Sequence, residues 1–221
     1  MAQAMRLPHQ YAAVIWDCDG VLIDSEALAC AASVDTLQRL GVDITLESYI
    51  ERFIGKSRQK ILDELGLTSD YPETVHAEHA ARQNALFKDK LKAIDGIHDV
   101  LSGAGVPMAV ASGSDPDRLS YTLGLTALAP YFNGHIYSAE IVAQGKPAPD
   151  IFLLAADKLG IAPKDCLVIE DSRFGIAAAR AAGMSVYAFT GGSHMTPSIR
   201  QGLIDAAPDA IVDHMQQLVR R

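Results

Sequence analysis

The sequence is poor in cysteine and has no long apolar run. Its 221 residues include three cysteines, Cys18, Cys30 and Cys166, and no two of them form a Cys-x-x-Cys pair. This pattern indicates neither a disulfide framework nor a zinc cluster, and it is typical of a reducing compartment. No stretch reaches the ~18 apolar residues of a membrane-spanning helix, and the first eleven residues lack the apolar core of a signal peptide. We therefore expect a cytoplasmic protein with no membrane partner.

Basic residues are outnumbered by acidic ones. The sequence has 19 Lys and Arg residues against 27 Asp and Glu residues, which gives a formal net charge of −8 at pH 7. Nucleic acid would repel such a chain at long range, so we expect no nucleic-acid partner. An anionic small substrate would need a local positive pocket. Hydrophobic residues make up 49% of the sequence, which is enough for a packed core.

Apolar segments of strand and helix character alternate from residue 96 onward. We expect strands at residues 12–16, 108–111, 166–169, 186–189 and 210–212, and helices at 97–103, after 115, at 151–159 and at 175–182. Such alternation predicts a parallel sheet, and hence an α/β fold with a Rossmann-like core.

The stretch from residue 25 to residue 93 has a different character. Four segments have the helical period, residues 27–40, 47–53, 58–65 and 72–91, and none has the pattern of a strand. Because this stretch follows the first strand directly, the chain must leave the core there and return to it. The sequence thus predicts an α/β core of residues 1–24 and 94–221, with an inserted all-helical domain of residues 25–93.

Polar residues follow three of the expected strands, at the point where each strand ends. They are Asp17 and Asp19 after the first strand, Ser112 after the second, and Glu170 with Asp171 after the third. The carboxyl ends of parallel strands meet at one edge of a sheet, so we expect these side chains to converge. Each residue taken alone could equally be a helix cap or part of a turn.

The types of these residues indicate a metal ion and a phosphate. Asp17, Glu170 and Asp171 would repel one another without a cation, and carboxylate oxygens suit Mg²⁺. Ser112, the backbone N–H groups of Gly113 and its neighbour at a helix start, and Lys146 would form an anion pocket. Lys146 precedes the first of two prolines, which hold its segment extended. A lone loop lysine is more often a solvated charge, but this context favours the pocket.

These residues resemble the four separated motifs of the haloacid dehalogenase superfamily. The motifs are Asp17-Cys18-Asp19-Gly20-Val21, Ser112, Lys146 and Glu170-Asp171, in that order, and a helical cap inserted after the first motif is a further family feature. The resemblance is closest to the sugar-phosphatase and β-phosphoglucomutase branch, through residues 24–26 and the Gly-x-Ser-Arg element at residues 55–58.

The resemblance implies a Mg²⁺-dependent phosphatase acting on a small phosphorylated metabolite, such as a sugar phosphate or a sugar-acid phosphate. Asp17 would be the nucleophile that forms an aspartyl phosphate, and Asp19 the general acid and then the base. Ser112 and Lys146 would offset charge on the phosphoryl oxygens. The Mg²⁺ ligands would be the Asp17 carboxylate, the Asp19 backbone carbonyl, Asp171, and Glu170 either directly or through water.

The resemblance also places substrate contacts in the cap. Arg58 and Lys56 would contact the distal end of the substrate, although both could be solvated cations at a helix start. His194, in a Gly-rich loop after the strand at 186–189, is a further candidate for a substrate contact. A chain that caps its own site is consistent with a monomer.

Three alternative functions remain open. A dehalogenase would not need Asp19, because a halide leaves without a proton. A phosphomutase of this branch carries a cap histidine where this chain has Ala29, and basic residues where it has Asp115-Pro116. A non-catalytic phosphoacceptor of the receiver type would be smaller and would lack the inserted domain. We therefore expect hydrolysis.

Overall fold

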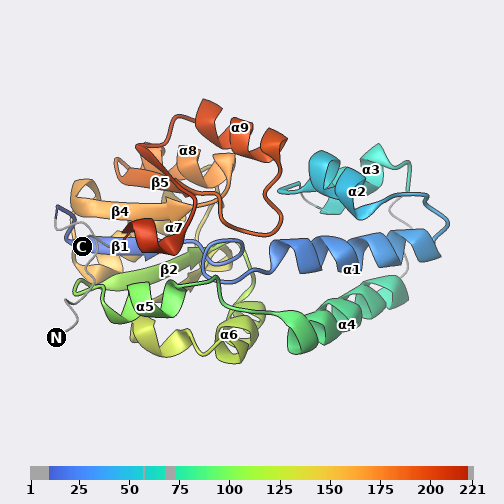
Figure 1. Cartoon of the computed structure of the whole chain (residues 1–221), viewed down its shortest axis with the longest axis horizontal. Helices are drawn as coiled ribbons and strands as arrows, with labels where there is room; N and C mark the ends of the chain where they lie inside the picture. Colours follow the sequence, from blue (N-terminus) through green and yellow to red (C-terminus); the bar gives the residue numbers. More distant parts are fainter. Residues whose placement is uncertain (1–9, 57, 68–72, 219–221) are drawn as a thin grey trace. The chain divides into compact units, whose positions relative to one another are not determined.

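The computed structural model describes residues 10–56, 58–67 and 73–218 (Figure 1). The chain divides into two compact units, one made of Met1–Asp24 with Lys92–Arg221 and the other of Ser25–Leu91. The sequence placed the return to the first unit at residue 94. The chain returns two residues earlier because Ala93 pairs with Ile23, and the N–H of Asp24 donates to the carbonyl of Lys92 over 3.0 Å.

The first unit contains a six-stranded sheet in the order β3-β2-β1-β4-β5-β6. Its strands are β1 (Ala13–Trp16), β2 (Met108–Ser112), β3 (Ile136–Ser138), β4 (Cys166–Glu170), β5 (Ser185–Phe189) and β6 (Ala210–Val212). All pairs are parallel; Trp16, for example, stands opposite Val110 of β2 and Ile169 of β4. This confirms the predicted Rossmann-like α/β core. The strand order reverses direction at β1, and such a switch point opens a crevice at the carboxyl ends of the strands.

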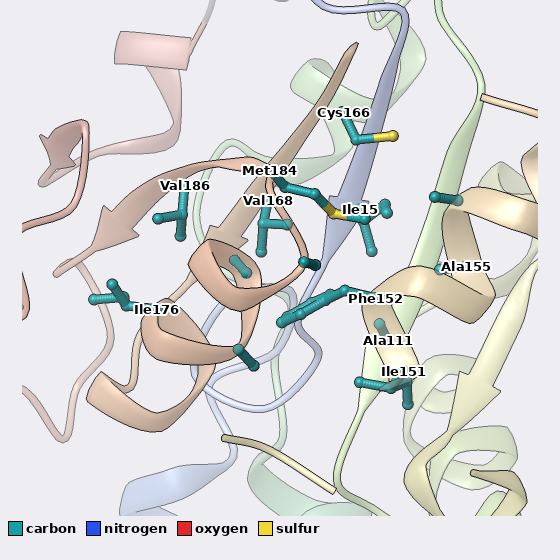
Figure 2. Packing of buried hydrophobic residues seen from close by; sticks show 14 of the residues in the cluster. Ile15, Ala111, Ile151, Phe152, Ala155, Cys166, Val168, Ile176, Met184 and Val186 are labelled. Carbon is teal, nitrogen blue, oxygen red and sulfur yellow. The ribbon is translucent and has the colours of Figure 1, made fainter. Parts of the chain in front are cut away.

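In the described part of the first unit, five α-helices connect these strands. They are α5 (Ile97–Ser102), α6 (Pro116–Leu125), α7 (Asp150–Leu159), α8 (Arg173–Ala181) and α9 (Pro197–Asp205), with short 3-10 turns at Ala129–Phe132, Ala139–Ile141, Pro163–Asp165 and Met215–Leu218. Figure 2 shows Phe152 of α7 and Ile176 of α8 in one cluster with Ile15 and Val168 of the central strands, and all four are fully buried. This packing fixes β1 and β4, and therefore the residues that follow them.

The described part of the second unit contains helices joined by turns and loops, and no strand. Its helices are α1 (Glu26–Arg39), α2 (Leu46–Phe53), α3 (Arg58–Glu64) and α4 (Glu73–Lys90). Thr45 caps α2 by accepting a hydrogen bond from the Ser48 N–H over 3.2 Å. An ion pair between Arg82 of α4 and Asp35 of α1 joins these two packed helices. Among the helices that the structure describes, none combines the length and the apolar character needed to cross a membrane.

Candidate active site

The structure brings the polar residues of three neighbouring strands together at the carboxyl edge of the sheet. Asp17 follows β1, Ser112 ends β2, and Glu170 ends β4 with Asp171 directly after it. All four side chains are buried although all four are polar. Buried carboxylates need partners or a cation, because the charged form loses its water. This edge of the sheet is therefore built for a ligand or for ion pairing.

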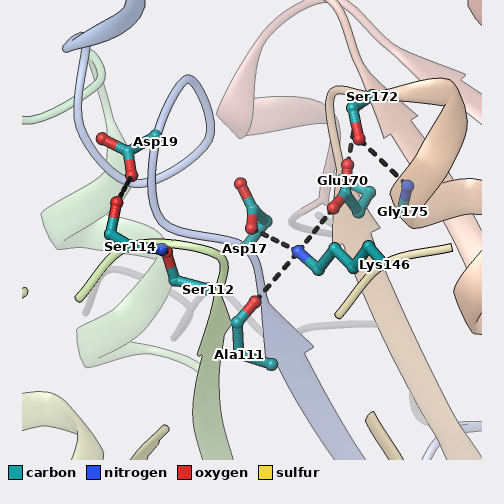
Figure 3. Close-up of polar contacts among 9 residues, drawn as sticks. All are labelled: Asp17, Asp19, Ala111, Ser112, Ser114, Lys146, Glu170, Ser172 and Gly175. Atoms are coloured by element: carbon teal, nitrogen blue, oxygen red, sulfur yellow. Dashed lines mark hydrogen bonds and ion pairs between the residues drawn. The ribbon is translucent and has the colours of Figure 1, made fainter. Parts of the chain in front are cut away.

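Lys146 forms the centre of this cluster (Figure 3). Its ammonium nitrogen Nζ donates to Asp17 Oδ1 over 2.5 Å, to Glu170 Oε1 over 2.7 Å and to the carbonyl of Ala111 over 3.0 Å. Burial alone would lower the pKa of Lys146, but the two carboxylates outweigh burial and raise it above its ordinary value. The lysine is therefore a permanent cation next to Asp17.

Two carboxyl groups of this cluster, those of Asp17 and Asp171, have raised pKa values. Burial raises the pKa of Asp17 well above its ordinary value; Lys146 opposes that rise, and Glu170 and Asp171 add to it. Burial also raises the pKa of Asp171, against the opposing effect of His194. Each of Asp17, Glu170 and Asp171 offers an oxygen within 4.8 Å of the other two. Three buried oxygen donors with excess negative charge fit a hard divalent cation such as Mg²⁺.

Asp19 is held apart from this cluster by different partners. Its Oδ2 accepts a hydrogen bond from the Ser114 hydroxyl over 2.6 Å, and its Oδ1 accepts one from Arg118 Nη2 over 2.9 Å. Figure 3 shows the two groups of contacts separately, with Asp19 and Ser114 on one side and Lys146 with its carboxylates on the other. The two aspartates of the first motif thus have different environments, as two different chemical tasks require.

The residues of the expected anion pocket lie before a helix and not in its first turn. The helix predicted after residue 115 is α6, which begins at Pro116 with Asp115 as its cap, so Gly113 and Ser114 lie before the helix start. The Asp115 side chain accepts from the Arg118 N–H over 2.8 Å, which fixes the helix start there. The Ser114 N–H donates instead to the Ser112 hydroxyl over 3.1 Å. Phosphate binding by Ser112, Gly113 and Lys146 stays a prediction.

His194 lies in the loop after β5 and is buried. Its Nε2 is 3.2 Å from Asp171 Oδ2, and its side chain is 2% exposed. Before it in the loop, Ser193 donates to Asp24 Oδ1 from its N–H over 2.9 Å and from its hydroxyl over 2.8 Å. His194 therefore contacts a candidate metal ligand, where the sequence suggested a contact to substrate.

The two cap residues predicted from the sequence have different outcomes. Lys56 lies between α2 and α3, and its Nζ pairs with Glu64 over 2.7 Å. Lys56 thus has an ion-pair partner within the helical unit. Arg58 begins α3, but its side chain lies outside the described residues, as does Ser57 of the same element. Substrate contacts by Arg58 and Lys56 stay predictions.

Two glycines leave room for the carboxylates of the site. Gly20 has φ +77°, and a Cβ there would overlap the Asp171 carboxylate; a Cβ at Gly175 in α8 would overlap that of Glu170. Glu170 Oε2 also accepts from the Ser172 N–H over 2.7 Å, so this carboxylate has little freedom to move away. Glycine at both positions therefore permits close approach of backbone to carboxylate.

We expect Gly175→Ala to destabilise the protein by about 1–3 kcal/mol, because the added methyl group displaces Glu170 from its hydrogen bonds. Gly202→Ala in α9 is the matched control, since nothing lies within 4 Å of a Cβ there. An interior helix glycine replaced by alanine should stabilise by roughly 0.5–1 kcal/mol. Urea unfolding midpoints of the two variants measure the difference. Equal midpoints would show that Glu170 is not confined as described.

Comparison with known proteins agrees with this arrangement. The sequence model of the haloacid dehalogenase-like hydrolases matches residues 11–183, which span β1 and extend beyond α8. The chain belongs to this family. The resemblance inferred from the four motifs is thereby confirmed.

Curated relatives and solved structures support the assignment. A 6-phosphogluconate phosphatase of Escherichia coli is 30% identical over 191 residues, covering 85% of this chain and 86% of the relative. A fructose-1-phosphate phosphatase of the same organism is 33% identical, covering 79% and 94%. A haloacid dehalogenase-like protein from Agrobacterium tumefaciens superimposes with a TM-score of 0.85 at 38% identity, covering 94% of this chain and 96% of that one.

Proposed function

We propose that the protein is a Mg²⁺-dependent phosphatase that hydrolyses a small phosphomonoester through an aspartyl phosphate on Asp17. The observation that carries the proposal is the placement of two aspartates two residues apart. Asp17 is paired with the Lys146 cation beside two further carboxylates, and Asp19 is held outside that cluster. One carboxylate is thus available as nucleophile and the other for proton transfer.

The first half of the reaction transfers the phosphoryl group to the protein. The Asp17 carboxylate attacks phosphorus, the bond from phosphorus to the leaving oxygen breaks, and Asp19 gives that oxygen a proton. The positive charge of Lys146 and the Ser112 hydroxyl offset the negative charge on the phosphoryl oxygens. Asp17, Asp171 and the backbone carbonyl of Asp19, with Glu170 directly or through water, would hold Mg²⁺, which would supply positive charge that offsets the charge of the phosphate.

The second half releases phosphate and restores the protein. Asp19, now a carboxylate, takes a proton from a water molecule, which attacks the phosphorus of the aspartyl phosphate. The bond between phosphorus and the Asp17 oxygen breaks, and inorganic phosphate leaves. Asp19 is then protonated again for the next substrate. Each aspartate returns to its starting state, so no further reactant is needed.

Sugar phosphates and sugar-acid phosphates are the substrate class that the comparisons favour. The two curated relatives are named for 6-phosphogluconate and fructose 1-phosphate. Dehalogenation is disfavoured because Asp19 is positioned for a proton transfer that a halide does not need. A phosphomutase is the second candidate, disfavoured by Ala29 in α1 and by Asp115 and Pro116 at the start of α6.

Phosphate release from a substrate panel tests the proposal. The panel contains 6-phosphogluconate, fructose 1-phosphate, phosphoglycolate and 4-nitrophenyl phosphate, each with Mg²⁺ and with a chelator. We expect release that requires Mg²⁺ and is fastest with a sugar phosphate or a sugar-acid phosphate. A folded protein that releases phosphate from none of them, yet interconverts the glucose phosphates, would establish the mutase instead.

Mg²⁺ should stabilise the folded protein, and more so at higher pH. Burial raises the pKa of Asp17 and Asp171 above the ordinary value of 3.8. Without metal, Asp17 and Asp171 therefore contribute most to the free energy of unfolding below pH 3.8. This contribution is lost as the pH rises through their raised pKa values. Protons and Mg²⁺ compete for these carboxylates, so Mg²⁺ stabilises the folded protein most at a pH where the carboxyl groups have lost their protons.

Thermal unfolding with Mg²⁺ and with a chelator measures this effect. At Mg²⁺ concentrations of roughly 100 times Kd, we expect the Tm to rise by about 5–10 °C near pH 8. The rise should be smaller near pH 5. A Tm that does not respond to Mg²⁺ at either pH would contradict binding at the carboxylate cluster.

A further inference from the structure

Asp19 has a contact that the four motifs do not include. Arg118, six residues after Ser112 and in the first turn of α6, places Nη2 2.9 Å from Asp19 Oδ1. The side chains of both residues are largely buried, with 25% and 11% exposed for Arg118 and Asp19. A charge-assisted hydrogen bond in such surroundings is stronger and more directional than one in water.

The two oxygens of Asp19 meet partners of different chemistry. A guanidinium group only donates hydrogen bonds, so the oxygen that faces Arg118, Oδ1, is fixed as an acceptor. A hydroxyl group both donates and accepts, so the Ser114 hydroxyl, 2.6 Å from Oδ2, can reverse its hydrogen bond. Oδ2 can thus carry a proton while Oδ1 stays bound to Arg118.

We propose that Arg118 is a positioning residue that holds the Asp19 carboxyl group by Oδ1 and directs its transferable proton to Oδ2, beside Ser114. The inference rests on the proposed phosphatase function, in which Asp19 protonates the leaving oxygen. Arg118 acts through Asp19 and has no role as nucleophile or phosphate ligand. The Asp19 side chain rotates about two bonds, and a hydrogen bond to each carboxyl oxygen restricts both rotations.

The backbones of Arg118 and Ser114 are themselves held by hydrogen bonds. The Arg118 backbone is anchored by its N–H to the Asp115 side chain over 2.8 Å and by its carbonyl, which accepts from the Thr122 hydroxyl over 2.8 Å. The Ser114 carbonyl accepts from the Ser138 hydroxyl of β3 over 2.7 Å. Both donors to Asp19 therefore stand on hydrogen-bonded backbone, which is what precise positioning of an acid requires.

Leaving groups of different basicity test the proposal. The kcat/KM value reports the steps up to departure of the leaving group, and nitrophenolate leaves without a proton, whereas a sugar alkoxide requires one. We expect Arg118→Met to lower kcat/KM for fructose 1-phosphate by about 100-fold and for 4-nitrophenyl phosphate by less than about 3-fold. Asp19→Asn should show the same discrimination, and adding Arg118→Met to it should cost little more.

Two further variants complete the design. Ser114→Ala should discriminate between the two leaving groups in the same direction, which keeps the test available should Arg118→Met fold poorly. Arg180→Met, on the exposed side of α8 where Arg180 pairs with Asp209, removes the same charge and should leave both rates unchanged.

Each outcome decides the inference. Equal losses with both leaving groups would overturn it, and so would a loss confined to 6-phosphogluconate, because Arg118 would then bind the distal carboxylate of the substrate. If Asp19→Asn slowed fructose 1-phosphate more than 4-nitrophenyl phosphate, but neither Arg118→Met nor Ser114→Ala did, the inference would be refuted while the proposed function would stand. A wild-type protein that releases no phosphate would refute the proposed function, and the inference with it.

Discussion

Asp17→Asn should lower the turnover of every phosphomonoester by at least about 1,000-fold while the protein stays folded. The amide has no carboxylate oxygen with which to attack phosphorus, so no aspartyl phosphate forms. The fold should survive because burial already disfavours a charge at this position and the Lys146 ammonium keeps Glu170, 2.7 Å away. Phosphate release and circular dichroism measure the two expectations.

Asp157→Asn in α7 is the matched control for that substitution. Asp157 lies on an exposed part of the helix, so the same chemical change should leave turnover unchanged. If Asp17→Asn kept a tenth or more of the wild-type rate, water would have to attack the substrate directly. The covalent mechanism would then be wrong, even if the protein proved to be a phosphatase.

Lys146→Met should reduce both turnover and stability. The substitution removes the cation that contacts Asp17, Glu170 and the Ala111 carbonyl, and leaves two buried carboxylates without it. Removing one partner of a buried ion pair costs about 3–5 kcal/mol, which corresponds to a fall in Tm of roughly 10 °C or more. The loss of its positive charge beside the phosphoryl oxygens should lower kcat by about 100- to 1,000-fold.

Lys164→Met is the control that separates the loss of the Lys146 contacts from the loss of a positive charge. Lys164 lies in an exposed 3-10 turn before β4, and its removal should change neither the Tm nor kcat. The measurements are thermal unfolding in the presence of a chelator and phosphate release with Mg²⁺. A Lys146→Met protein that unfolds at the wild-type temperature would show that the carboxylates do not depend on the lysine.

The strands and the acidic cluster were predictable from local patterns. Apolar runs such as those at β1 and β4 end in polar residues, and parallel pairing brings those ends together whatever their separation in sequence. β3 was missed because it has only three residues, and Ile136 and Tyr137 are half-buried, so neither length nor apolar character marked it. Its pairing with β2 depends on the existing sheet edge.

The residues around Asp19 and Asp171 were harder to infer. No sequence motif includes Arg118, although an N-cap at Asp115 places Arg118 in the first helical turn. The contact of His194 with Asp171 depends on how the loop after β5 folds back, which no local pattern encodes. Contacts between residues distant in sequence thus complete a site whose main residues the motifs identify.

Acid-quench mass spectrometry of Asp19→Asn during turnover of 4-nitrophenyl phosphate tests the central claim most directly. This variant should still form the aspartyl phosphate, because nitrophenolate needs no proton, but should hydrolyse it slowly for lack of a base. We predict one phosphoryl group on the peptide that contains Asp17, and none when Asp17→Asn is added. Sustained nitrophenol release with no phosphoryl group at Asp17, or with the group on another residue, would contradict the account.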